Sequence, residues 1–426
     1  MRLENSSVED LKQLEAKLSS EYEQIRAQNL KLDLTRGKPS AEQLDLSIGI
    51  EGILQGQYVD ENGVDLRNYG GLDGLPQAKA LFSDVLECSP EDVIIGGNAS
   101  LSLMHQALMI AYYFGVRDSS SAWCCQQSPV KFLCPVPGYD RHFSICEQLG
   151  IEMIHVPMND EGPDMDKIEA LVQADSMIKG IWCVPRFSNP TGIVYSPKTV
   201  QRLAQLPLKA GPDFRVMWDN AYAVHEFASD AEPLSSLWEQ AVKFSTRDHV
   251  YMFGSTSKVT FAGAGVAFMA VSPMNRKNFL RHLGMATIGP DKINQQRHVK
   301  FLQDFRGIRS HMHKHAELLR PRFDCVLRHL EKNFLNSDMG TWTRPKGGYF
   351  VSFNTRPGLA KEVVQLASEV GVKLTPAGAT FPYGKDPEDQ NIRIAPSFPT
   401  LKDIDQAMEV FCLCVRLASA RQVLSS

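Results

Sequence analysis

The sequence predicts an α/β protein with a mostly parallel central sheet, helices on both faces of that sheet, and a smaller α+β domain near the C-terminus. Apolar runs of strand length begin near residues 93, 130, 151, 180, 214 and 249, and helical stretches separate them. Strands that alternate with helices form parallel sheets, which bind ligands at the carboxyl ends of their strands. Beyond residue 334, shorter strands and helices follow one another without that regularity.

The length and composition bound the function classes. A chain of 426 residues suggests two to three domains. We expect an N-terminal arm with part of the small domain in residues 1–60, a large domain in 61–300 and the small domain in 301–426. The net charge of −4 gives no basic field, so nucleic acid is not an expected partner.

Cysteine usage and hydropathy point to the cytoplasm. The nine cysteines are scattered and form no CxxC pair, which favours a reducing compartment and argues against disulfides or a zinc site. No positively charged segment followed by an apolar one opens the chain, so no secretory signal is expected. The stretch 93–116 lacks formal charge, but its polar residues favour a buried helix over a membrane span.

The N-terminal segment predicts an amphipathic helix. Ser7 stands three residues before Asp10, as at a capped helix start. An apolar stripe follows at helical spacing, formed by Leu11, Leu14, Leu18, Tyr22 and Ile25. We expect this arm to pack on the body of the protein or on a second subunit. Leu32–Pro39 then reads as a short strand and a turn that carries Arg36.

Two glycine-rich turns precede helices. The first, Asn68–Leu75, leads into a helix expected over 77–87 and is by itself only a turn. The second joins a strand at 93–95 to a helix that starts near Ser100. Backbone N–H groups at such a helix start can bind phosphate, although Asn98 or Ser100 could instead cap the helix.

A lone lysine follows the strand at 249–253. Lys258 comes after Ser255 and Ser257, and the seventeen residues 259–275 carry no charge. A buried ammonium group tends to lose its proton, and the neutral amine can form a Schiff base with a carbonyl. The small serines suit a phosphate, so the carbonyl compound implied is pyridoxal 5'-phosphate (PLP).

The C-terminal third predicts a long linking helix and the small domain. We expect one helix over 292–334, with its histidines at 298, 311, 313 and 315 on a solvated face. His311 and His315 share a helix face, but no carboxylate or thiol nearby completes a metal site. A strand over 347–353, a helix over 360–370, a short strand over 391–395 that carries Arg393, and a helix over 401–418 follow.

Three motifs in a fixed order carry a family resemblance. They are Asn189-Pro190-Thr191-Gly192, Asp219-x-x-Tyr222 and Ser255-x-Ser257-Lys258. In this order the chain resembles fold-type I PLP enzymes of the aspartate aminotransferase superfamily. It is most similar to the aspartate aminotransferase-like subgroup related to the transaminase half of MocR-type regulators. The resemblance covers Leu32 to the C-terminus, and nothing before it resembles a winged-helix DNA reader.

The resemblance implies a role for each candidate residue. Lys258 forms the Schiff base and moves the proton, Asp219 keeps the pyridine nitrogen protonated, and Asn189 and Tyr222 bind the phenolic oxygen. Arg393 grips the substrate α-carboxylate. Tyr139 stacks on the ring, and the phosphate is held by Asn98, Ala99, Ser100, Ser255, Ser257 and, from a second subunit of a homodimer with shared sites, Tyr69.

The cationic side chains suggest where a second carboxylate of the substrate could bind. Arg36, with Gly37 allowing close approach of the backbone, is the candidate for a distal carboxylate, although a surface salt bridge is an equally common role for such an arginine. Arg141, Arg186 and Lys346 are the next cations. Val266 stands where most relatives carry an arginine that pairs with the phosphate. We expect an aminotransferase that uses L-aspartate and 2-oxoglutarate. The alternatives are another PLP reaction, such as β-lyase or decarboxylase chemistry, and a non-catalytic PLP-binding sensor.

Overall fold

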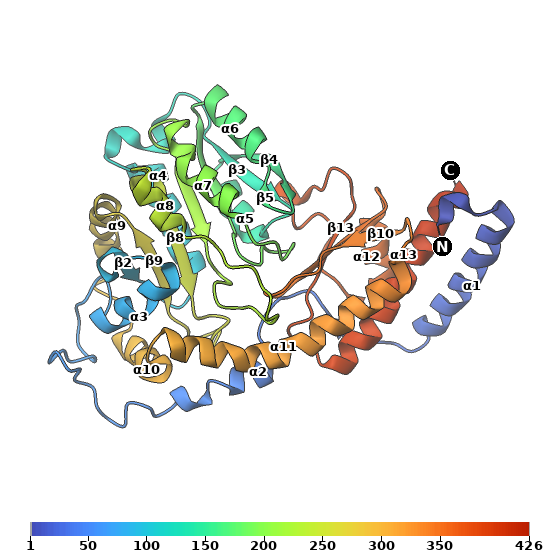
Figure 1. Cartoon of the computed structure of the whole chain (residues 1–426), viewed down its shortest axis with the longest axis horizontal. Helices are drawn as coiled ribbons and strands as arrows, with labels where there is room; N and C mark the ends of the chain where they lie inside the picture. The colour runs from blue at the N-terminus through green and yellow to red at the C-terminus, as the bar shows by residue number, and fades with distance from the viewer. Residues whose placement is uncertain (1, 426) are drawn as a thin grey trace.

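The computed structural model describes residues 2–425 and is built around an eight-stranded sheet (Figure 1). Its strands run in the order β2-β9-β8-β7-β6-β3-β4-β5. The strands from β8 through β7, β6 and β3 to β4 are parallel, while β2, β9 and β5 pair antiparallel. The bounds are β2 Val93–Ile95, β3 Lys131–Val136, β4 Glu152–Asn159, β5 Gly162–Pro163, β6 Ile178–Cys183, β7 Arg215–Asp219, β8 Val250–Ser255 and β9 Ala267–Val271.

Helices cover both faces of this sheet, as predicted. Successive side chains of a strand point to opposite faces. In β8, Val250 and Met252 therefore pack in one apolar core, while Tyr251 and Phe253 pack in the other. The first core is shared with α3 Pro76–Leu86, α6 Met165–Ala174, α7 Pro197–Gln205 and α8 Leu237–Lys243. The second is shared with α4 Ser100–Phe114, α5 Asp140–Gln148 and α9 Pro273–Ala286.

Two smaller sheets lie at the other end of the molecule (Figure 1). An antiparallel sheet joins β10, β11 and β13, and the N-terminal β1 pairs with β12 in parallel. Helices α11 (Phe305–Phe334), α12 and α13 pack with them in a third core. The bounds are β1 Leu32–Asp33, α2 Ala41–Asp45, β10 Gly340–Trp342, β11 Val351–Thr355, α12 Ala360–Glu369, β12 Val372–Lys373, β13 Asn391–Ile394 and α13 Leu401–Ser425.

The N-terminal arm is a helix that packs on its own chain. Helix α1, Val8–Arg26, begins after Ser7, whose side chain accepts a hydrogen bond from the Asp10 N–H, as the sequence predicts. Its apolar stripe lies against α13 (Figure 1). The Tyr22 hydroxyl donates to the Leu366 carbonyl at 2.9 Å. The arm therefore completes the core of the C-terminal part.

The prediction of a single helix over 292–334 is wrong. The structure has two helices, α10 Lys292–Leu302 and α11 Phe305–Phe334. Gln303 adopts a φ of 64°, and the Asp304 side chain caps α11 by accepting from the Gly307 N–H at 2.7 Å. The break arises because Asp304 satisfies a free N–H group of a new helix start. Helix α11 runs along the molecule and joins its two ends (Figure 1).

The histidines of this region do not form a solvated face. His298, His311 and His315 are buried, and only His313 of the four is exposed. The sequence prediction was therefore wrong for three of them. The expected strand over 347–353 is also shorter, since β11 starts at Val351, and the last helix runs on to Ser425. No helix among residues 2–425 has the length and hydropathy needed to cross a membrane.

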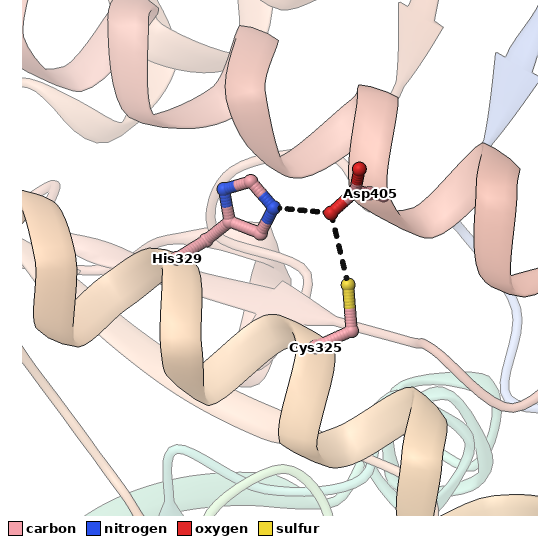
Figure 2. A group of neighbouring side chains, drawn as sticks. All are labelled: Cys325, His329 and Asp405. Atoms are coloured by element: carbon pink, nitrogen blue, oxygen red, sulfur yellow. Dashed lines mark hydrogen bonds and ion pairs between the residues drawn. The ribbon is translucent and has the colours of Figure 1, made fainter.

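A polar cluster ties α11 to α13 (Figure 2). Cys325 and His329 lie one turn apart on α11, and both donate to Asp405 Oδ1 on α13, at 3.5 and 2.8 Å. Such groups can ligate zinc. However, Arg328 donates to the same carboxylate at 3.1 Å and to the sulfur at 3.3 Å. Its positive charge opposes a bound cation, so we interpret the cluster as a link between helices.

Candidate functional site

A cavity of about 580 Å³ lies at the carboxyl ends of the central strands. Its wall contains residues that follow β3, β6, β7 and β8, which is where parallel sheets bind ligands. The N-terminal segment and the strands of the smaller sheets supply the opposite wall. The predicted site residues that line it are Arg36, Gly37, Ser100, Tyr139, Asn189, Asp219, Tyr222, Lys258 and Arg393.

Lys258 lies partly buried in this wall. It lies three residues beyond the end of β8, in a turn where the Thr256 carbonyl accepts from the N–H groups of Val259 and Thr260. Burial lowers the pKa of the lysine, and the nearby Asp219 carboxylate opposes that shift. Its amine lies 4.8 Å from the centre of the Tyr222 ring. The structure thus provides an amine whose charged form is disfavoured.

Asp219 ends β7 and has one satisfied and one free oxygen. The residue is 3% exposed. His142 Nε2 donates to Asp219 Oδ2 at 3.0 Å, while Oδ1 is buried without a hydrogen-bond partner among residues 2–425. A buried carboxylate oxygen without a donor is costly, so the site is built to receive one. A ligand that brings an N–H group to Oδ1 would satisfy it.

His142 was missed by sequence reasoning. Its ring stacks on Trp182 with centroids 4.2 Å apart and an interplanar angle of 7°, which fixes its direction toward Asp219. The only signal in the sequence was its place on α5, three residues after Tyr139 and hence on nearly the same helix face. Tyr139 precedes α5, and its ring meets His142 edge-on at 5.0 Å. Burial raises the pKa of Tyr139 to about 12.

Arg393, on β13, reaches across the cavity to the large sheet. Its Nη1 donates to Asn189 Oδ1 and to Asp140 Oδ1, both at 3.2 Å. The guanidinium lies 4.9 Å from the centre of the Phe350 ring, and its Nε is buried without a partner. An arginine that retains a free donor in a closed cavity is suited to bind a carboxylate.

The N-terminus of α4 lies beside the lysine turn. Ala99 is the N-cap residue of α4, and no side chain caps the helix. The capping role considered for Asn98 or Ser100 is therefore wrong, and the first N–H groups stay available for an anion. Ser257 Oγ donates to the Asn98 carbonyl at 3.2 Å, and Ser255 Oγ donates to Ser257 Oγ at 3.0 Å. The five residues proposed to hold a phosphate thus lie together.

The remaining candidates separate into two groups. Arg36 and Arg141 line the cavity. Arg186 instead lines a different cavity, where its Nη2 lies 3.7 Å from Glu226 Oε2. Lys346 pairs with Asp230 and Glu232 at the surface. These last two cations are therefore poorly placed to bind a ligand here.

Gly37, Tyr69 and Val266 have simple structural explanations. A Cβ atom at Gly37 would overlap the Phe350 ring, so packing alone already requires glycine there. Tyr69 is 83% exposed and does not reach the cavity of its own chain. Val266 is buried in an apolar core, and its N–H donates to Thr256 Oγ1 at 2.9 Å. The backbone N–H of Val266 thus stabilises the turn that carries Lys258.

Together these groups fit PLP. The unpartnered Asp219 oxygen suits a protonated ring nitrogen, the uncapped start of α4 suits a phosphate, and the amine of Lys258, with its lowered pKa, suits a carbonyl carbon. Each feature is a property of the protein chain alone. A single molecule that carries a pyridine nitrogen, a phosphate group and an aldehyde would satisfy all three at once.

Comparisons with known proteins agree with this chemistry. A family model described as aspartate amino-transferase matches residues 6–426. A presumed aminotransferase of Mycolicibacterium smegmatis is 49% identical over 407 residues, covering 95% of this chain and 94% of that protein. An aspartate aminotransferase of Corynebacterium glutamicum is 43% identical, with coverage of 95% and 93%.

Solved structures and regulators extend the comparison. The crystal structure of an aspartate transaminase from Corynebacterium glutamicum superposes with a TM-score of 0.95 at 42% identity, covering 99% of each chain. Three helix-turn-helix regulators of Bacillus subtilis also match, at 22–32% identity over 42–67% of this chain. The expected relation to regulators with a transaminase-like part is thereby confirmed.

Proposed function

This chain belongs to the aspartate aminotransferase family and is a PLP-dependent aminotransferase, and we propose that it transfers the amino group of L-aspartate to 2-oxoglutarate. One observation carries the proposal for the site: a lysine amine with a lowered pKa, a buried carboxylate oxygen without a partner among the described residues and an arginine with a free Nε line one cavity. The choice of aspartate is supported by the relatives that bear this substrate in their names.

Asp219 and His142 would set the electronic state of the cofactor. When bound, PLP supplies an electron-withdrawing ring that accepts the electron pair released at the substrate α-carbon. Asp219 Oδ1 would accept a hydrogen bond from the ring nitrogen and hold a proton on it. His142 would keep the carboxylate oriented and charged through its bond to Oδ2. Tyr139 would cover one face of the ring.

Lys258 would act as the base. Burial favours its neutral amine, which can take the proton from the substrate α-carbon and return it elsewhere. Asn189 and Tyr222 would bind the ring oxygen from the same side of the cavity. The first N–H groups of α4, with Ser255 and Ser257, would hold the phosphate.

Arg393 would orient the substrate by its α-carboxylate. Asn189 already accepts from Nη1, which leaves Nε free to donate to a ligand oxygen. Arg36 would bind the distal carboxylate of a dicarboxylic substrate, with Arg141 as the second candidate because both line the cavity. Binding of both carboxylates selects substrates by the distance between these groups as well as by their charge.

We further propose a homodimer with shared active sites that works in the cytoplasm. Tyr69 is almost fully exposed in the single chain, and a large aromatic side chain in that state suits burial by a second copy. All nine cysteines are free, which suits a reducing compartment. We keep the division into an N-terminal part of residues 1–60, a large PLP-binding domain of 61–300 and a small domain of 301–426.

A panel of amino donors with the purified protein tests this proposal. With 2-oxoglutarate as acceptor, aspartate should be the preferred donor and should give oxaloacetate and glutamate in equal amounts. Release of ammonia and pyruvate from a donor would indicate β-lyase chemistry, and release of CO₂ would indicate a decarboxylase. A protein that binds PLP but turns over no donor would be a sensor, and this result would contradict the proposal.

A further inference from the structure

Two consecutive peptide carbonyls at Lys258 are held by side chains from distant parts of the chain. The Lys258 carbonyl accepts from His225 Nε2 at 3.2 Å and from the Tyr349 hydroxyl at 3.5 Å. The Val259 carbonyl accepts from His311 Nε2 at 2.7 Å. Because a carbonyl can only accept, each of these side chains must donate. None of them lines the cavity described above.

A second layer fixes the donors themselves. Gln43 accepts from the Ser40 N–H through Oε1, and this contact sets the orientation of its amide. Gln43 Nε2 then donates to His315 Nδ1 at 3.2 Å and to the Tyr349 hydroxyl at 3.0 Å. His315 must therefore carry its proton on Nε2. His311 Nε2 also carries a proton, so the 3.2 Å contact between the two Nε2 atoms is not a hydrogen bond between the rings. The Val259 carbonyl accepts a hydrogen bond from the His315 ring as well.

The network joins four separate segments at the lysine. Gln43 belongs to α2, His311 and His315 to α11, Tyr349 to the segment before β11, and His225 to the turn after β7. His315 and Tyr349 are fully buried. Burial also lowers the pKa of His315 to about 4, so its ring is neutral at physiological pH and keeps one donor and one acceptor.

We propose that His311 and His315, with His225 and Tyr349, are positioning residues for Lys258. Their donors hold the two carbonyls and thereby fix the point from which the lysine side chain enters the cavity. This inference rests on the proposed role of Lys258 and adds the residues that set its position. A misplacement of about 1 Å at a reacting group can cost roughly a hundredfold in rate, so such support matters for turnover.

Ordinary core packing is the competing explanation, and substitution of His311 separates the two. His311→Leu fills a similar volume but leaves the Val259 carbonyl without its shortest donor. His311→Gln places an N–H group near the position of the lost Nε2. His313→Leu is the matched control, because His313 lies on the same helix but is exposed and pairs only with Glu317 at 3.6 Å.

The first readout needs neither cofactor nor activity. The full-length protein, freed of PLP, is acetylated with acetic anhydride over a range of pH, and labelling of Lys258 is followed by mass spectrometry. The apparent pKa of Lys258 should rise toward that of an exposed lysine in His311→Leu, because a loosened turn exposes the amine. His311→Gln and His313→Leu should match the wild type.

The second readout is the kinetic split in the holoenzyme. His311→Leu should lower kcat roughly tenfold while KM for the amino donor changes less than about twofold, since the substrate arginines are untouched. His311→Gln should recover most of kcat. If His311→Leu does not fold, Tyr349→Phe removes only one hydroxyl and should shift both readouts in the same direction.

An unchanged pKa of Lys258 together with unchanged kcat in His311→Leu would overturn the proposal, even if thermal stability fell. Failure of the aminotransferase assignment looks different. In that case the wild type would transaminate no donor, yet the labelling profile of Lys258 would still distinguish His311→Leu from His311→Gln.

Discussion

The Asp219→Asn substitution isolates the charge of the carboxylate from its shape. In the wild type, His142 Nε2 donates to Asp219 Oδ2 at 3.0 Å, and the oxygen of the asparagine can still accept this hydrogen bond. The amide nitrogen then takes the place of Oδ1, the oxygen that has no partner in the protein. It presents a donor where the ring nitrogen of PLP needs an acceptor, so the ring would lose its proton and accept electrons poorly.

The expected magnitude follows from the contacts. A hydrogen bond to a charged group contributes about 1.5–3 kcal/mol, and Asp219 is 3% exposed, which places the value toward the upper end. That energy corresponds to a loss of roughly 10- to 150-fold in kcat. His142→Leu, which leaves Oδ2 without a donor, should give a smaller loss in the same direction.

The assay is steady-state transamination of aspartate by enzyme fully loaded with PLP, with cofactor content checked by absorbance. Asp213→Asn is the matched control, because this carboxylate precedes the same strand at its other end and pairs with Arg117 at 3.0 Å. It should leave kcat unchanged. Turnover of loaded Asp219→Asn within about twofold of wild type would refute the pairing of Asp219 with the ring.

Three further predictions follow from other parts of the structure. Arg36→Ala should lower kcat/KM for aspartate roughly tenfold or more while sparing alanine, and an unchanged aspartate-to-alanine ratio would move the role to Arg141. Analytical ultracentrifugation should give twice the mass of the single chain, and a fully active monomer would exclude sites shared through Tyr69. The pKa of His315 is lowered to about 4, so the unfolded chain binds its proton first as the pH falls below about 6.5. The thermal midpoint should therefore drop between about pH 7 and 5, and less steeply in His315→Gln.

The elements that carry the site could be predicted because their signals are local. Each strand of the parallel sheet is a short apolar run. Asp219 ends one such run, and Asn189 and Lys258 lie in the loops that follow two others. Parallel strands end at one edge, so sequence order was enough to bring these residues together. The role of Arg393 could be predicted only from the family resemblance, because its short strand carries no local signal for the cavity that the side chain faces.

The parts that failed depend on contacts between distant segments. The break between α10 and α11 rests on one capping side chain, Asp304, inside an otherwise helical pattern. His311 and His315 look like a polar face in the sequence, yet they are buried because Gln43 and the Val259 carbonyl lie against them. A polar side chain can be buried once it is partnered, and its partners are separated from it by up to 272 positions.

Covalent trapping of the cofactor tests whether Lys258 is the residue that carries it. The holoenzyme is reduced with borohydride, digested, and the pyridoxyl group is located by mass spectrometry. The amine of Lys258 has a lowered pKa and lines the same cavity as Asp219, so we expect that the label sits on Lys258 and that Lys258→Ala takes up none. A pyridoxyl group on any other lysine would contradict the account.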